Sequence, residues 1–203
     1  MRNHLSTARP TAAMLLACGI SAASLPLARP ALAHVTPNVE LIRKGEFVKD
    51  NLPGAVKYLE KKLDIGAADR AAIKKTTGWT PSEEEYRIYV GRDAQGQLVG
   101  TAIFLWVPSE HGPVGVAVAF DRGGAIVRAT VTDVASEPLA WVRPLLAGDG
   151  LAAFRGLALT AIPGAAQVAP SVTGRMSRYY AGVIAAGVGR AQALEQLALA
   201  AGK

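Results

Sequence analysis

Cysteine and histidine, the residues that most often ligate metals or serve as nucleophile and base, are scarce in this chain. There is one cysteine, Cys18, and of three histidines only His111 lies beyond residue 34. Because a zinc site takes three or four converging ligands, His111 with Glu110 beside it does not predict one. A Gly-x-Ser-x-Gly motif and the Gly-rich loops of P-loop and Rossmann proteins are also missing. The sequence therefore disfavours metal chemistry and catalysis by a nucleophile of its own.

Acidic residues are missing from the first 33 positions. Arg2 and Arg9 precede an uncharged apolar run from Thr11 to Leu27, and the stretch then closes with Ala31-Leu32-Ala33. A basic start, an apolar run and small residues at the last and third-last positions are what signal peptidase recognises. We therefore predict a signal peptide at residues 1–33, cleaved after Ala33.

Cleavage at that point leaves a mature chain, 34–203, that we expect to be periplasmic or extracellular. It would contain no cysteine, and so no disulfide and no thiolate. Losing three arginines and no acid lowers the net charge from +6 to +3, with 19 basic and 16 acidic residues. That balance is too mild to predict nucleic-acid binding. The alternative is a lipoprotein lipidated on Cys18, because Leu15-Leu16-Ala17-Cys18 resembles a lipobox.

Residues 39–77 are predicted to form a helical lead-in. Apolar residues recur there at helical spacing, and Pro53-Gly54 separates the first stretch from the second. The apolar positions of the second stretch are Val56, Leu59 and Leu63. A third short helix is expected from Ala67 to Lys75, ending near Gly78.

Between residues 85 and 134 apolar and polar residues alternate, which is typical of half-buried strands. Four strands are predicted, at 86–90, 98–107, 114–120 and 125–134. Short turns separate them, including one at Asp93–Gln97 that contains Gly96. Strands joined by such short connections predict an antiparallel meander.

Helices are predicted again after the strands. Leu139–Leu146 is expected to be a short helix, and an alanine-rich run from about Gly174 to Ala201 a long one. Glycines at 182, 187 and 189 either let the long helix approach the sheet closely or divide it in two. The fold class is therefore α+β, a single domain at 34–203 with its core at about 85–190.

The entry to that last helix carries the best candidate chemistry. Its first turn exposes N–H groups and the positive end of the helix dipole. Hydroxyl and guanidinium groups surround that point, a combination that suits a phosphate. They belong to Ser171, Thr173, Arg175, Ser177 and Arg178. The alternative is an ordinary helix cap with two surface arginines.

Five short motifs follow one another between Tyr86 and about Val188. They are an opening hairpin (86–91 and 96–100), a central hairpin (112–118 and 124–127), Glu137-Pro138, Phe154-Arg155-Gly156 and Ser171–Arg178. In this order they resemble the FMN-binding domain of the flavin-carrying subunits of Rnf and Na⁺-pumping NADH:quinone reductase complexes. The resemblance implies FMN as the cofactor and a membrane-bound redox complex as the partner.

The family's flavin-attachment motif, Ser-Gly-Ala-Thr followed by Ser-Arg, falls on Ser171–Arg178. Its Glu-Thr-Pro turn falls on Glu137-Pro138, which adds Glu137 to the implied cofactor site. In the family the Thr carries FMN through a phosphoester, and the alignment places Gly174 there. Glycine has no hydroxyl, so we expect FMN to be held non-covalently. Covalent attachment at Thr173 would need a shift of register.

The sequence thus predicts an exported FMN-binding protein that transfers electrons outside the cytoplasm, with no catalytic residue of its own. Candidates for packing on the flavin ring are Trp106, Trp141, Tyr179 and Tyr180. Two alternatives remain: a cofactor-less member that serves as an accessory or interaction module, and a periplasmic binder of another anion.

Overall fold

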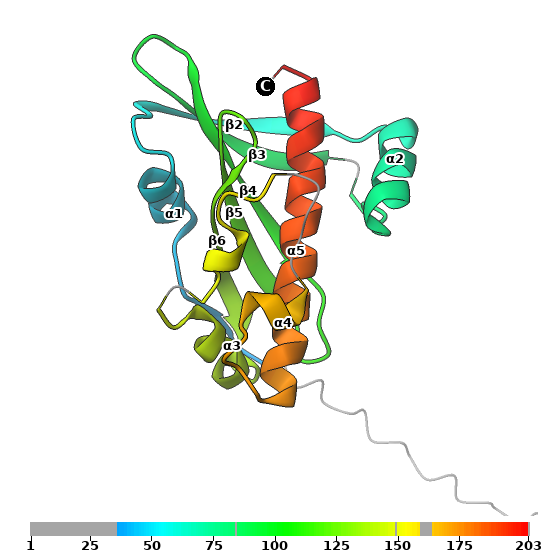
Figure 1. Cartoon of the computed structure of the whole chain (residues 1–203). Coiled ribbons are helices and arrows are strands. Elements are labelled where there is room, and N and C mark those ends of the chain that lie inside the picture. The colour runs from blue at the N-terminus through cyan, green and yellow to red at the C-terminus, as the bar shows by residue number, and fades with distance from the viewer. Residues whose placement is uncertain (1–35, 84, 149, 159–163, 203) are drawn as a thin grey trace, which may run out of the picture. The chain divides into compact units, whose positions relative to one another are not determined.

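The computed structural model of the chain describes residues 36–83, 85–148, 150–158 and 164–202. The signal peptide at 1–33 and its cleavage site lie outside these residues and stay predictions. The helices and strands follow in chain order (Figure 1). They are β1 (Asn38–Glu40), α1 (Lys44–Asn51), β2 (Lys57–Asp64), α2 (Ala67–Thr77), β3 (Glu85–Arg92), β4 (Leu98–Val107), β5 (Val114–Asp121), β6 (Ile126–Ala135), α3 (Leu139–Leu146), the 3-10 turn η1 (Ala152–Phe154), α4 (Ala165–Val168) and α5 (Arg175–Ala200).

One antiparallel sheet of six strands forms the centre of the fold, in the order β1-β6-β5-β4-β3-β2. The predicted meander of β3 to β6 and the α+β class are confirmed. The β3–β4 turn closes as expected, because the N–H of Asp93 donates to the carbonyl of Gln97 over 3.0 Å. Gly96 takes a φ of 78°, which glycine adopts at little cost.

The helical lead-in is partly wrong, because residues 57–64 form strand β2 and residues 38–40 form strand β1. Leu59 and Leu63 are four residues apart, an even number that places them on one face of a strand as well as on one face of a helix. Pairing with β3 decides between the two, since Leu63 lies opposite the buried Tyr86. The third helix is confirmed as α2, which ends at Gly78 in the left-handed conformation.

The long C-terminal helix is confirmed as one continuous helix, α5, packed on one face of the sheet. Gly187 makes the close approach that the sequence allowed. A Cβ atom there would lie 2.8 Å from a methyl of Val107 and 2.9 Å from a methyl of Val116. Most of the hydrophobic core lies between α5 and the sheet.

Helix α1 covers the opposite face, so the residues of β4 alternate between two environments. Thr101 and Val107 face α5, whereas Ala102 and Phe104 pack in a smaller cluster with Phe47 of α1. The rings of Phe47 and Phe104 meet edge to face, with centroids 5.6 Å apart.

Strands β3 and β4 pair over only part of their length. Their register runs from Ile88 opposite Ile103 to Arg92 opposite Leu98, and Glu85–Arg87 has no partner on β4. Figure 1 shows the β2–β3 hairpin turning across the direction of the other strands. The sheet therefore opens at this point, beside the second half of α5.

Candidate functional site

The predicted phosphate site lies at the first turn of α5, which we call the α5 entrance (Ser171–Arg178). Gly174 is the N-cap in extended conformation, and the N–H of Arg178 donates to its carbonyl over 3.0 Å. Because glycine has no side chain, the N-cap cannot itself cap the N–H groups of the first turn. Ser171 and Thr173 precede it in the connection from α4, and both are exposed.

Arg175 and Arg178 are both exposed. They are three residues apart, so they share one face of the helix. Ser177 is buried, and a Cβ atom at Gly174 would lie 3.7 Å from its hydroxyl oxygen. The structure therefore places Ser171, Thr173 and the two arginines at the surface, whereas Ser177 is a mostly buried residue.

Glu137 lies just before α3, and its side chain pairs with His111. Its carboxylate oxygen is 2.9 Å from Nδ1 of His111, and the two side chains are 52% and 29% exposed. A row of rings leads from there to α5. His111 lies 5.0 Å from Trp141 and Trp141 stacks on Tyr180 at 6.0 Å and 19°, between ring centroids. Tyr179 meets Tyr180 edge to face at 5.1 Å. We call His111, Trp141, Tyr179 and Tyr180 the aromatic wall.

The β4–β5 loop anchors this wall to the sheet. The hydroxyls of Ser109 and Tyr180 lie 3.3 Å apart, and the N–H of Glu110 donates to the hydroxyl of Tyr179 over 3.0 Å. Burial raises the pKa of Tyr180, and the nearby charges of Tyr179 and Glu137 raise it further, whereas the bond to Ser109 lowers it. Tyr180 therefore stays protonated at neutral pH.

Three of the four aromatic residues suggested for the flavin ring come together in the wall: Trp141, Tyr179 and Tyr180. Trp106 does not, because it follows the alternation of β4 onto the face away from α5, where it is 51% exposed. The sequence was considered to predict no metal site at His111, and its place against Trp141 was missed. The signal was the connection between two predicted strands, 98–107 and 114–120, which puts His111 at the end of the sheet.

The α5 entrance presents an exposed surface, because Ser171, Thr173, Arg175 and Arg178 are all exposed, and four cavities among the described residues are lined elsewhere. The largest of these four, about 660 Å³, lies between α2 and the second half of α5. The next, about 510 Å³, lies where β3 and β4 diverge. Trp79 and Arg190 line both of them.

Within the described part of the chain, no three acidic, histidine or cysteine side chains gather as they would around a metal ion. The same residues include no helix long and apolar enough to cross a membrane. Comparison with protein-family models, with curated proteins and with solved structures gives no match.

Proposed function

We propose that the mature chain is an exported protein that binds FMN non-covalently at the α5 entrance and transfers electrons outside the cytoplasm, to or from a membrane-bound redox complex. One observation carries the proposal: two exposed arginines and an N-terminal helix turn lie directly beside a wall of aromatic rings. A phosphate and a flat ring system are the two parts of FMN that need separate partners. When bound, the flavin would supply the redox chemistry and the protein its position and surroundings.

The phosphate would meet Arg175, Arg178 and the N–H groups of the first turn. The helix dipole contributes about 0.3–1 kcal/mol for an anion at this position. Each charge-assisted hydrogen bond from an arginine contributes about 1.5–3 kcal/mol. The exposed hydroxyls of Ser171 and Thr173 add further donors at the same end of the helix.

The ring system would lie against the aromatic wall. Trp141, Tyr179 and His111 are only partly buried, so their surfaces are open to a ligand. Gly174 lacks the hydroxyl that an ester to the phosphate needs. The attachment is therefore non-covalent, and mild denaturation should release the flavin.

The test compares FMN with riboflavin, which has the same rings and no phosphate. Arg175→Gln and Arg178→Gln should each weaken FMN binding about tenfold to a hundredfold and leave riboflavin binding nearly unchanged, as measured by calorimetric titration. Arg122→Gln, which alters an exposed arginine in the β5–β6 turn, is the matched control. If the arginine variants weaken the binding of FMN and of riboflavin equally, the arginines do not contact the phosphate.

A second candidate is a cofactor-less accessory module, and one observation favours it: the hydroxyl and guanidinium residues of the α5 entrance, Ser171, Thr173, Arg175 and Arg178, are all exposed. The same titration decides between the two. If the unmutated mature protein binds neither FMN nor riboflavin, the module is favoured and the flavin proposal fails. Binding of inorganic phosphate with no preference for FMN would instead indicate an anion binder.

A further inference from the structure

A second ligand site is indicated beside the other half of α5. The cavity between α2 and α5 and the cleft between β3 and β4 meet at Trp79 and Arg190. Their volumes, about 660 and 510 Å³, are each large enough for a small organic molecule. We call the two together the double cleft. Arg190 is twelve residues beyond Arg178 on the same helix, about 18 Å along its axis at 1.5 Å per residue.

Arg190 is a partly buried cation with no acidic partner among the described residues. Its guanidinium carbon lies 5.5 Å from the centroid of the Trp79 ring, and burial lowers its pKa. No carboxylate of the described residues forms an ion pair with it. Since burying an unpaired charge is costly and an aromatic face compensates only part of that cost, the position is suited to an anion from outside the chain.

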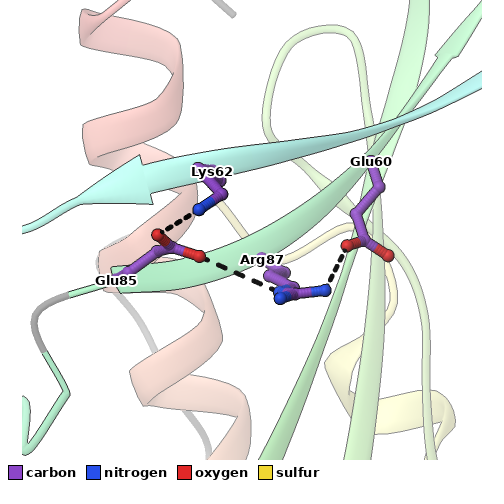
Figure 2. Close-up of polar contacts among 4 residues, drawn as sticks. All are labelled: Glu60, Lys62, Glu85 and Arg87. Atoms are coloured by element: carbon purple, nitrogen blue, oxygen red, sulfur yellow. Dashed lines mark hydrogen bonds and ion pairs between the residues drawn. The ribbon is translucent and has the colours of Figure 1, made fainter.

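The acidic residues that the structure describes in the lining of the double cleft do not supply that anion. Glu60 and Glu85 are already neutralised on the β2–β3 hairpin, where their carboxylates alternate with Arg87 and Lys62 (Figure 2). The carboxylate–cation distances are 2.7 Å for Lys62–Glu85, 2.7 Å for Arg87–Glu60 and 3.9 Å for Arg87–Glu85. Glu83 is exposed at the rim.

The shape of the double cleft favours a flat apolar body. On the α5 side, the wall of the larger cavity consists mainly of residues with little or no side chain, at Ala185, Ala186, Gly189 and Ala193. On the other side, Trp79 meets Tyr86 edge to face, with centroids 5.9 Å apart. Such a wall offers a smooth surface to a planar ring and no depth for a branched chain.

We infer that the double cleft binds an aromatic carboxylate, whose carboxylate pairs with Arg190 and whose ring lies between Trp79 and the small residues of α5. This site is independent of the α5 entrance and of the proposed flavin function. It uses Arg190, which is partly buried and borders both cavities, whereas Arg175 and Arg178 are exposed.

The probes are 2-naphthoate and its neutral counterpart 2-naphthalenemethanol, titrated calorimetrically into the mature protein. Arg190→Gln should weaken 2-naphthoate about tenfold to a hundredfold and leave the neutral probe nearly unchanged. Ala186→Leu should weaken both, because the added side chain occupies the cavity from an exposed helical position. Arg122→Gln is again the matched control and should change neither.

Failure of the unmutated protein to bind 2-naphthoate, or equal affinity in the Arg190→Gln variant, would overturn the inference. Stronger binding of decanoate than of 2-naphthoate would contradict the inference that the ligand is flat. If Arg190→Gln weakens FMN binding and Arg178→Gln does not, FMN itself binds in the double cleft. This result would support the double cleft as a site for flat aromatic anions. That result would at the same time move the flavin away from the α5 entrance, so the two proposals fail separately.

Discussion

The two halves of α5 present their chemistry in opposite ways. At the start of the helix, two arginines and the residues Ser171 and Thr173 are exposed, and three of the four rings of the aromatic wall are partly exposed, Tyr180 being buried. Along the second half, the helix lies so close to the sheet that Gly187 has no room for a side chain, and Glu195 is fully buried. Figure 1 shows α3 and α4 beside the first half and α2 beside the second. The same helix therefore offers polar groups to solvent at one end and encloses them at the other.

Close packing in the second half predicts the largest effect. Gly187→Leu should lower the free energy of unfolding by about 3 kcal/mol or more, because even a Cβ atom would overlap methyls of Val107 and Val116. Gly45→Leu in α1 is the matched control, since nothing lies within 4 Å of a Cβ there. It should stabilise the protein by up to about 1 kcal/mol. Denaturant unfolding of both variants measures this, and a neutral Gly187→Leu would show that α5 does not touch the sheet as described.

The buried carboxylate of Glu195 predicts a dependence of stability on pH. Burial raises its pKa to about 7, and the charge of Asp121 adds to the rise, while the hydrogen bond from Thr101, 2.6 Å long, opposes it. Within the described part of the chain, its other oxygen and the side-chain oxygen of the neighbouring Gln192 have no hydrogen-bond partner.

The unfolded chain loses the Glu195 proton near pH 4.5 and the folded one near pH 7. Stability should therefore fall as pH rises through this window and stay low above it. The loss is at most about 3 kcal/mol, from 1.36 kcal/mol per pKa unit. The glutamine in Glu195→Gln cannot ionise. The variant should therefore be more stable than the unmutated protein near pH 8, and this difference in stability should vanish near pH 4.5. Urea unfolding at both pH values is the measurement, and a variant with the wild-type pH profile would contradict the assignment.

The sequence predicted some regions of this molecule better than others. The sequence predicted four strands, α2 with its end at Gly78, and α5. Each of these is indicated by a local signal, either the spacing of its apolar residues or a glycine at its end. Strand β2 was missed because Leu59 and Leu63 fit both periods, and only pairing with β3 decides. The α5 entrance was found from a contiguous stretch. The aromatic wall and the double cleft join residues far apart in sequence, such as Trp79 and Arg190, and no local pattern indicates such contacts.

The smallest effect is expected just before α3, where Glu137→Gln alters the contact of Glu137 with His111, which is an ion pair only when the histidine is protonated. Both side chains are partly exposed, and ion pairs in contact with solvent contribute about 0–1 kcal/mol. Unfolding free energy should therefore change by less than about 1 kcal/mol. In contrast, Trp141 stacks on the buried Tyr180, so the wall is held by ring packing more than by charge.

A double-mutant cycle with His111→Gln isolates the pair from other effects of each change. Its coupling energy should also stay below about 1 kcal/mol. A coupling well above that value would mean that the His111–Glu137 pair is shielded from water. The contrast between an open first half of α5 and an enclosed second half would then be wrong at this point. A small coupling leaves Glu137 available to a ligand at the wall without a large cost in stability.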